Sequence, residues 1–244
     1  MVLKSAVDYE IDGNVFEGVL CSPEKPKNAK LPAVVILHAF FGCSEFETEK
    51  AEQLAELGYV AFAADVYGKG KRGTTREENF ALMKPLIEDR CGVLKQRLEG
   101  AYNYVAGLDI VDAKKISAIG FCFGGLCVLD MARHKLPLRS VVSFHGTLTP
   151  LPGTESLEGL EELNPAVCVL HGDADTHVNA QVEKFMVEMR VRKADFVFTS
   201  YGSAKHGFMM PVTDKLNLPG VGYCAKTERR AWSAMKDFLN ESLQ

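Results

Sequence analysis

The sequence predicts an α/β fold, α/β-hydrolase in type, with a mostly parallel β-sheet and helices on both faces. Three observations carry this prediction. Short runs such as Ala33–Leu37 are apolar at every position, which is typical of strands covered on both faces. Segments with helical spacing separate these runs, and such βαβ alternation produces parallel sheets. One strand also leads through a glycine-bounded turn, Gly120–Gly125, directly into an apolar helix.

The N-terminal half opens on a predicted hairpin. Residues Tyr9–Cys21 alternate between apolar and polar positions and include two glycines, which suits a turn between two strands. A surface connection rich in Pro and Lys is expected over Ser22–Pro32. The other elements predicted in this half are a strand at Ala33–Leu37, a helix at Phe46–Leu57, a strand at Tyr59–Ala63, a basic glycine-rich loop at Gly68–Thr75 and a largely helical stretch at Arg76–Tyr104.

The C-terminal half continues the alternation. Its predicted elements are the strand Ile116–Ile119, the helix after the glycine-bounded turn, strands at Ser140–Phe144, Ala166–Leu170 and Phe196–Tyr201, and helices at Ala180–Val191 and Tyr223–Leu243. The chain contains no internal repeat or low-complexity segment, and 244 residues are ordinary for one undivided α/β domain. A single domain is therefore expected over residues 1–244.

Composition argues against several classes of partner. The net charge of −4 and the pI near 5.9 provide no attraction to nucleic acid or anionic membranes. No apolar run reaches the roughly 18 residues of a membrane span, and the N-terminus lacks the apolar core of a secretion signal. The seven cysteines include no C-x-x-C pair, which argues against a disulfide framework or a structural zinc site. We expect a cytoplasmic protein without cofactor or metal.

The turn Gly120–Gly125 matches a nucleophile elbow with cysteine in place of serine. Such a turn strains its central residue, here Cys122, and glycines two positions away on either side leave room for the close backbone approach. The Cys122 side chain would stand exposed at the carboxyl end of the sheet. Its sulfur would also lie near the positive end of the following helix, which favours a thiolate.

A base and an orienting acid are expected near Cys122, because ligand sites in parallel sheets form beyond the carboxyl ends of the strands. One predicted strand is followed by Asp173 and Asp175, and the next by His206. Cysteine, acid and histidine thus occur in the chain order of α/β-hydrolases. An imidazole shifts a thiol toward thiolate, and a carboxylate orients the imidazole. The H-G-x-x-D-x-x-V spacing favours Asp175 over Asp173 as the acid.

These motifs make the chain resemble the dienelactone hydrolase family of α/β-hydrolases. The resemblance covers most of the chain and rests on the motifs His38–Gly42, Ala64–Tyr67, Gly120–Gly125, His171–Asp175 and His206–Phe208. Carried over by motif position, it implies that Cys122 is the nucleophile, His206 the base and Asp175 the orienting acid. It also implies an oxyanion hole formed by the backbone N–H groups of Phe40 and Phe123.

The chain departs from the founding members of this family around the expected pocket. They have a glutamate where this chain has Ala39, and that acid is thought to deprotonate the cysteine when substrate binds. Two arginines grip their substrate's carboxylate. Arg76 either matches one of these or is a charge in the first turn of a helix, and Met210 replaces the other. The residues expected to contact substrate are Ala39, Arg76, Phe80, Phe208 and Met210. All of them except the arginine are apolar, which suggests a more apolar pocket than in the founding members.

We therefore expect a hydrolase that cleaves a small-molecule ester or lactone through an acyl-cysteine intermediate. Thioester and activated phosphoester hydrolysis stay open, because the same nucleophile could serve both. Two alternatives come from other classes: a non-catalytic ligand-binding protein on the hydrolase fold, and a redox-active thiol protein. The redox alternative would use Cys122, with Cys127 as a resolving thiol. The sequence does not indicate an oligomeric state.

The remaining histidines and cysteines are expected to be structural. His38 and His171 each end a strand and are expected to hold loops by hydrogen bonds. His145 is expected to pack near the site, and His134 and His177 to lie at the surface. The cysteines expected to be structural are Cys21, Cys43, Cys91, Cys127, Cys168 and Cys224.

Overall fold

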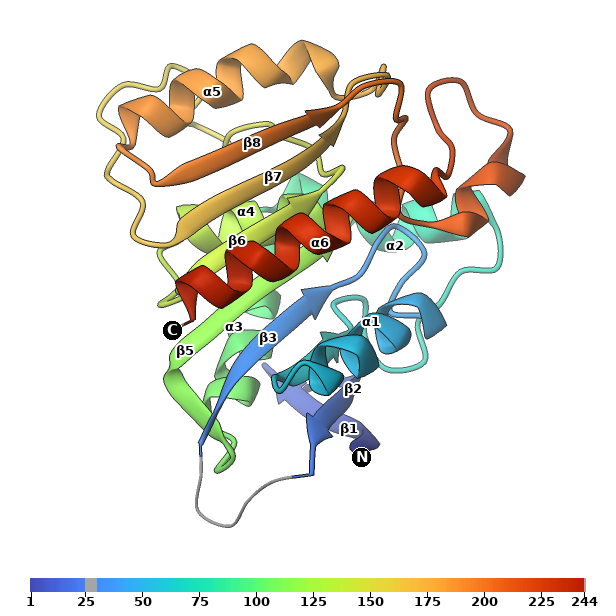
Figure 1. The fold of residues 1–244 in the computed structure, drawn as a ribbon, viewed down its shortest axis with the longest axis vertical. Coiled ribbons are helices and arrows are strands. Elements are labelled where there is room, and N and C mark those ends of the chain that lie inside the picture. The colour runs from blue at the N-terminus through green and yellow to red at the C-terminus, as the bar shows by residue number, and fades with distance from the viewer. Residues whose placement is uncertain (25–29, 244) are drawn as a thin grey trace.

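The computed structural model describes residues 1–24 and 30–243 of the protein. Its ribbon shows one twisted sheet with helices on either side (Figure 1). The strands are β1 (Val2–Ile11), β2 (Asn14–Pro23), β3 (Leu31–Leu37), β4 (Val60–Ala64), β5 (Val111–Phe121), β6 (Ser140–Phe144), β7 (Ala166–Gly172) and β8 (Phe196–Tyr201). The helices are α1 (Glu45–Glu56), α2 (Arg76–Glu88), α3 (Val93–Ala106), α4 (Phe123–Arg133), α5 (Val182–Val191) and α6 (Ala225–Ser242), with short 3-10 turns η1 (Asn179–Gln181) and η2 (Pro211–Leu216).

The described strands form one eight-stranded sheet in the order β1-β2-β4-β3-β5-β6-β7-β8. Strands β3 to β8 run parallel, whereas β2 pairs antiparallel with both β1 and β4. The mostly parallel sheet expected from the sequence is confirmed. Register aligns the carboxyl ends of neighbouring strands, since Leu37 lies opposite Gly120, and Phe121 opposite Phe144. The loops that leave these strands therefore meet at one edge of the sheet.

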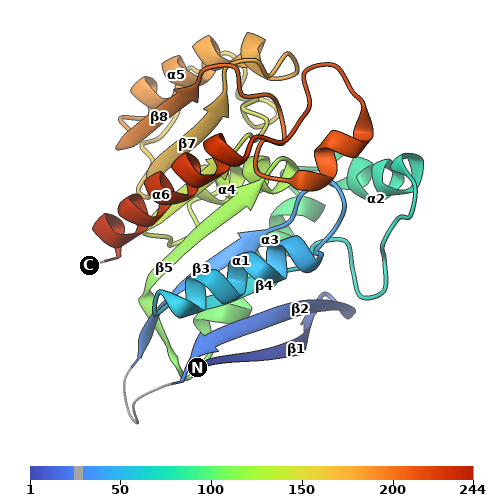
Figure 2. The same ribbon diagram turned by 45° about the vertical axis from the view of Figure 1, so that its right-hand side comes forward.

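Each face of the sheet has its own apolar core. In β3, Val35 belongs to the core covered by α3, α4 and α5, whereas its neighbour Ile36 belongs to the core covered by α1 and α6. Figure 2 shows α1 and α6 on one side of the sheet and α3 and α4 on the other. Because both faces are covered, successive strand residues are all apolar, as the sequence pattern indicates.

Several predicted boundaries in the N-terminal region differ from the structure. Strands β1 and β2 each have ten residues and pair along their full length, so the hairpin is longer than expected. The connection expected at Ser22–Pro32 is shorter, because β2 continues to Pro23 and β3 begins at Leu31. Residues 25–29 of that connection lie outside the described residues.

The helical stretch expected at Arg76–Tyr104 is two helices. α2 ends at Glu88, and α3 begins at Val93. Between them, the carboxylate of Asp89 accepts hydrogen bonds from the backbone N–H groups of Gly92 and Val93, both at 2.9 Å. The free N–H groups at a helix start need such acceptors, so Asp89 separates the two helices by capping the second one.

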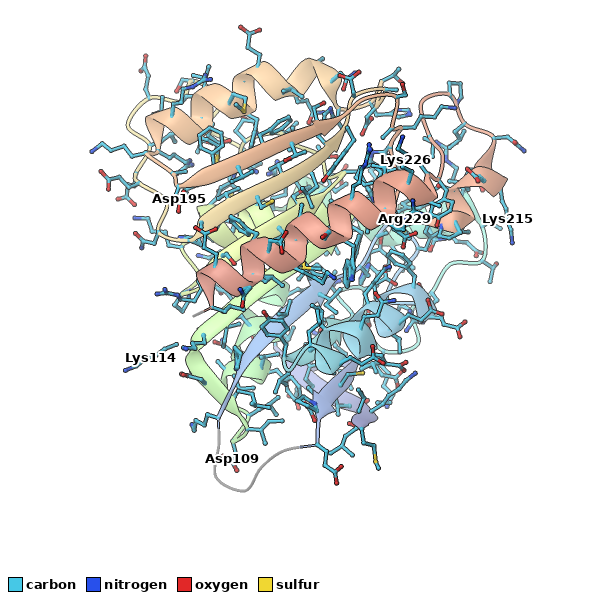
Figure 3. All side chains as sticks on the ribbon, in the orientation of Figure 1. Asp109, Lys114, Asp195, Lys215, Lys226 and Arg229 are labelled. Atoms are coloured by element: carbon cyan, nitrogen blue, oxygen red, sulfur yellow. The ribbon has the colours of Figure 1, made fainter. Side chains whose placement is uncertain are left out.

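Charged side chains of both signs cover the surface. Those labelled in Figure 3 are all exposed and are spread over loops, β5, η2 and α6: Asp109, Lys114, Asp195, Lys215, Lys226 and Arg229. Within the described residues, no helix combines the length and the apolar character needed to cross a membrane.

Candidate active site

Cys122 lies in a strained turn between β5 and α4. Its backbone dihedrals are φ 53° and ψ −110°, a region that L-residues rarely adopt. Its N–H donates a hydrogen bond to the Phe144 carbonyl at 3.0 Å, which ties the turn to β6. A Cβ at Gly120 would collide with the backbone of Gly124, and one at Gly124 with the backbone of Leu37. Close backbone approach therefore requires both glycines, and the turn presents the Cys122 thiol at the carboxyl edge of the sheet.

Three side chains form a hydrogen-bonded chain at this edge. His206 Nε2 lies 3.1 Å from Cys122 Sγ, and His206 Nδ1 lies 2.8 Å from Asp175 Oδ2. Asp175 is fully buried, and its Oδ1 accepts the backbone N–H groups of His177 and Val178. The carboxylate is thereby fixed in place, and it orients the imidazole toward the sulfur.

The loop after β8 holds His206 from both sides. The His206 N–H donates to the Gly220 carbonyl at 2.8 Å, and the Gly222 N–H donates to the His206 carbonyl at 3.0 Å. Asp173, the other acid on the loop after β7, is exposed. The structure thus brings Asp175, rather than Asp173, to the imidazole, in agreement with the motif spacing.

Electrostatics favour a thiolate–imidazolium pair between Cys122 and His206. Burial raises the pKa of the Cys122 thiol. This effect is outweighed by the charge of His206, by the hydrogen bond from His206 and by the N–H groups of Phe123 and Phe40, so the pKa is lowered. Burial lowers the pKa of His206, whereas the Cys122 charge and the bond to Asp175 raise it to about 10. Each partner stabilises the charge of the other. The pair therefore favours an ionised thiol although the chain has alanine, and not glutamate, at position 39.

The N–H groups of two residues contribute to the lowered pKa of Cys122 and so act on its sulfur. One belongs to Phe123, the first residue of α4, and the other to Phe40, in the loop after β3. A negative charge that develops on an oxygen beside the sulfur would meet the same two donors. Such donors would suit an oxyanion hole, in which fixed N–H groups stabilise the charge of a tetrahedral intermediate, and this role of Phe40 and Phe123 stays a prediction.

Two further residues hold the loop that carries Phe40, and neither is predicted from the sequence to do so. Glu47, buried in α1, accepts the backbone N–H groups of Ala39 at 3.1 Å and Ser44 at 2.9 Å. Tyr67, after β4, donates its hydroxyl to the Phe40 carbonyl at 3.0 Å. The spacing Ser-x-x-Glu of a capping box is a sequence signal that could have revealed Glu47.

Three of the predicted substrate-binding residues lie in very different surroundings. Ala39 is almost fully buried next to α1, and its N–H is bound to Glu47. Arg76 is exposed at the start of α2, and Phe80, one turn later, is 53% exposed. Arg76 and Phe80 thus lie one turn apart on α2 and are exposed, whereas Ala39 is buried, and the contact of all three with substrate stays a prediction.

Phe208 and Met210, the other two predicted substrate-binding residues, belong to the core on the α1 and α6 face of the sheet, and their contact with substrate stays a prediction. Both side chains are buried, and the ring of Phe208 packs edge-on against the rings of His145 and Tyr201. A turn closed by the Met210 N–H and the Gly207 carbonyl, at 2.9 Å, follows His206 directly. The side chains of Phe208, Met209 and Met210, inside and at the end of this turn, all belong to that core.

The other histidines have distinct structural positions. His38 Nε2 accepts a backbone N–H from the segment after β4 at 3.1 Å, and His171 Nε2 lies 2.7 Å from a side-chain amide oxygen. The prediction that both hold loops is confirmed. His145 is fully buried, and neither of its ring nitrogens has a hydrogen-bond partner within the described part of the chain. His177 is exposed, as expected, whereas His134 is half-buried because its Nε2 is bound to a backbone carbonyl.

All seven cysteines are free thiols, and they differ in how deeply they are buried. Cys122 and Cys224 are partly exposed, and Cys91 is exposed. The buried cysteines are Cys21, Cys43, Cys127 and Cys168. Burial raises the pKa of Cys127 well above its ordinary value, so this thiol is protonated and poorly reactive although it lies in the same helix as the elbow.

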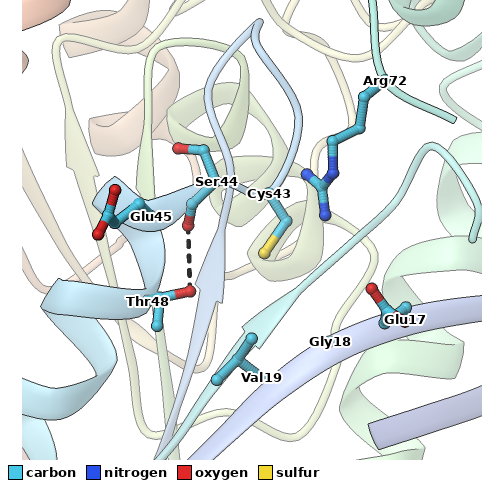
Figure 4. Close-up of a pocket in the computed structure, with 8 residues that line it drawn as sticks. All are labelled: Glu17, Gly18, Val19, Cys43, Ser44, Glu45, Thr48 and Arg72. Atoms are coloured by element: carbon cyan, nitrogen blue, oxygen red, sulfur yellow. Dashed lines mark hydrogen bonds between the residues drawn. The ribbon is translucent and has the colours of Figure 1, made fainter. Parts of the chain in front are cut away.

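Two hollows lie apart from the hydrogen-bonded chain. One, of about 270 Å³, is shown in Figure 4 and is lined by Glu17, Gly18, Val19, Cys43, Ser44, Glu45, Thr48 and Arg72. The other, of about 410 Å³, is lined by residues on both sides of His206 in the sequence, among them Lys205 and Tyr223. Cys122 lines neither hollow. The candidate site is therefore identified by the chemistry of its residues and not by the depth of a cavity. Among the described residues, no three His, Cys, Asp or Glu side chains are grouped as metal ligands.

Comparison with known proteins agrees with the fold and the motifs. A family model described as the dienelactone hydrolase family matches residues 16–243. The uncharacterised protein K02A2.1 of Caenorhabditis elegans is 47% identical over 159 residues, which cover 64% of this chain and 99% of that protein. A putative carboxymethylenebutenolidase of Saccharolobus solfataricus is 23% identical over 272 residues and covers 97% of this chain and 98% of its own length.

Solved structures with high similarity include two that match along the whole chain. The structure m3DLH has a TM-score of 0.91 at 33% identity, over 100% of this chain and 99% of the other. A dienelactone hydrolase-like promiscuous phosphotriesterase from metagenomic libraries has a TM-score of 0.91 at 30% identity, also over 100% and 99%. The family and the fold expected from the sequence are thereby confirmed.

Proposed function

The chain belongs to the dienelactone hydrolase family of hydrolases, and we propose that it cleaves carboxylic esters or lactones through an acyl-cysteine intermediate. The observation that carries this proposal is the catalytic triad geometry, with His206 Nε2 3.1 Å from Cys122 Sγ and His206 Nδ1 2.8 Å from Asp175. Two relatives are named as a putative carboxymethylenebutenolidase and a probable lactonase, which supports lactones as one substrate class.

In the proposed reaction, the Cys122 thiolate adds to the carbonyl carbon of the substrate and forms a carbon–sulfur bond. The carbonyl electron pair moves to oxygen, where the N–H groups of Phe40 and Phe123 stabilise the charge. When the tetrahedral intermediate collapses, the bond to the alcohol oxygen breaks and His206 gives its proton to that oxygen. The alcohol leaves, or stays tethered when the substrate is a lactone.

The second half of the reaction regenerates the thiolate. His206, now neutral, takes a proton from water as the water oxygen attacks the thioester carbon. Collapse of this second intermediate breaks the carbon–sulfur bond and releases the carboxylic acid. Asp175 keeps the imidazole oriented and stabilises its cationic form in both halves.

Stopped-flow release of p-nitrophenolate tests the proposal. We expect the wild-type protein to hydrolyse p-nitrophenyl acetate and butyrate, with turnover or at least a burst of one equivalent. Cys122→Ala removes the nucleophile, so both signals should disappear. Equal slow release from both proteins would overturn acyl transfer at this cysteine. Ligand binding without release would then favour the non-catalytic alternative, and reversible peroxide-dependent oxidation of Cys122 the redox alternative.

Phosphotriester hydrolysis is a second candidate activity. The observation that favours it is the 30% identity, along the whole chain, to a promiscuous phosphotriesterase. In this reaction the Cys122 thiolate would attack phosphorus and displace an aryloxide. Diethyl p-nitrophenyl phosphate tests the idea with the same two proteins. Release that requires Cys122 supports it, and release that Cys122→Ala leaves unchanged contradicts it.

A further inference from the structure

Tyr67 contacts both residues that form the candidate oxyanion hole. Its hydroxyl donates to the Phe40 carbonyl at 3.0 Å. Its ring stacks on the ring of Phe123, with centroids 6.0 Å apart and an interplanar angle of 23°. Phe40 lies in the loop after β3, and Phe123 begins α4, so Tyr67 joins two segments that are far apart in the sequence.

Tyr67 is itself held firmly. Its side chain is almost fully buried, and its backbone N–H donates to Asp65 Oδ1 at 2.8 Å. The ring of His38 packs edge-on against it, with centroids 4.5 Å apart. The guanidinium of Arg97, in α3, donates to the Tyr67 carbonyl at 3.3 Å. Strand β4, the end of β3 and α3 therefore all fix the position of this side chain.

The Phe40 peptide depends on such fixed partners. The N–H of Ala39 is bound to Glu47 at 3.1 Å, and the carbonyl of Phe40 is bound to Tyr67. The N–H of Phe40, which helps to lower the pKa of Cys122, lies between these two anchors along the chain. Without the Tyr67 hydroxyl, one anchor is lost and the donor can turn away from the sulfur.

We propose that Tyr67 is a positioning residue that sets the spacing between the Phe40 and Phe123 oxyanion donors. The inference rests on the proposed acyl-transfer function. Donors in an oxyanion hole act only when they lie within about 2.7–3.1 Å of the developing charge, so a small shift of the Phe40 loop matters. Burial raises the pKa of the Tyr67 hydroxyl, which therefore stays a neutral donor throughout the working range of pH.

Tyr67→Phe is the direct test, because it removes one hydroxyl and keeps the ring. We expect kcat for p-nitrophenyl acetate to fall about 10-fold with KM changed less than twofold, a smaller loss than removal of a whole oxyanion donor. Binding of an aryl trifluoromethyl ketone, which adds to the thiolate and mimics the tetrahedral intermediate, should weaken by the same factor. Tyr102→Phe is the matched control, since its hydroxyl reaches only the Pro137 carbonyl, at 3.5 Å.

An activity-independent readout separates this inference from the proposed function. Iodoacetamide alkylation of Cys122 across a pH series reports the pKa of the thiol, and we expect Tyr67→Phe to raise it, because the Phe40 N–H no longer stabilises the thiolate. A wild-type protein without Cys122-dependent ester release would refute the proposed function alone. An active wild type with kcat, inhibitor binding and thiol pKa all unchanged in Tyr67→Phe would refute the positioning role.

A purely structural role for Tyr67 predicts a different pattern. In that case Tyr67→Phe lowers the Tm but leaves kcat and the thiol pKa unchanged, and this result would also overturn the inference. Phe123→Leu provides a second variant if Tyr67→Phe does not fold. It removes the stacking partner and keeps the backbone N–H, so it should lower kcat with little change in KM.

Discussion

Helix α4 has a buried network of charged groups at each end, and only one of these networks ends in a reactive atom. At its N-terminal end, Cys122 Sγ is bound to His206, which is bound to Asp175. At its C-terminal end, Asp130 accepts two hydrogen bonds from Arg90, both at 2.7 Å, and one from Arg133 at 3.1 Å. Glu188 and Arg192 complete the second network.

The difference lies in how completely each charge is paired. Arg133 lies between the carboxylates of Asp130 and Glu188, and both acids have two arginine partners. Every member of this network is almost fully buried, so its charges only stabilise the packing of α4. Cys122, in contrast, is partly exposed and lies at the end of its chain. Under the proposed function, the exposed and strained sulfur makes one end of the helix reactive, whereas the buried ion pairs make the other end structural.

Removing the imidazole breaks the reactive end and has the largest expected effect. In His206→Ala the thiol loses both its counter-charge and its proton carrier, so kcat/KM for p-nitrophenyl acetate should fall about 10,000-fold. The pKa of Cys122 should rise, because burial raises it and only the N–H groups of Phe123 and Phe40 are left to oppose burial. Iodoacetamide alkylation would then require alkaline pH, whereas in the wild type it declines only as the pH falls below the lowered pKa. Alkylation at neutral pH as fast as in the wild type would contradict the ion pair, and His134→Gln is the remote control.

Removing one acid breaks the inert end. Arg90 and Arg133 both pair with the carboxylate of Asp130, and Asp130→Ala removes this shared partner while both arginines stay buried. The loss of one partner from a buried pair typically costs about 3–5 kcal/mol. We expect the free energy of unfolding in urea to fall by this amount, while kcat per folded molecule changes less than twofold. Asp109→Ala, at an exposed carboxylate, should leave stability unchanged. A fall in kcat as large as the fall in stability would mean that the two ends of α4 are coupled.

The smallest effect is expected at Cys127, between the two networks. Cys127→Ala removes one buried sulfur and should cost about 1 kcal/mol of stability, with kcat unchanged. After peroxide treatment, mass spectrometry of the wild type should show no disulfide between Cys122 and Cys127, because burial keeps Cys127 protonated. A peptide pair lighter by two hydrogens would instead support the redox-active alternative.

Local sequence patterns predict the residues at the strand ends well. The glycines around Cys122 are required by backbone contacts, and such contacts leave a direct mark on the sequence. Parallel register then brings the loop with Asp175 and the loop with His206 to the same edge, as the order of strands and motifs indicates.

The surroundings of the site could not be predicted in the same way, because they depend on tertiary contacts. No local pattern indicates that the Tyr67 hydroxyl reaches the Phe40 carbonyl, or that Arg90, between α2 and α3, reaches Asp130 in α4. The expected pocket residues Phe208 and Met210 are apolar, and an apolar residue next to a site in the sequence can equally well turn into the core. Their direction is set by the turn after His206 and not by their chemical type.

The separation of the site over the chain has a consequence during biosynthesis. Cys122 leaves the ribosome long before Asp175 and His206, which lie after β7 and β8. Until those later loops dock, the thiol has no imidazole partner and behaves as an ordinary, mostly protonated cysteine. A nascent chain that ends before His206 therefore contains the elbow without an activated nucleophile. Under the proposed function, the nucleophile therefore gains its base only after β8 and the loop that follows it have been synthesised.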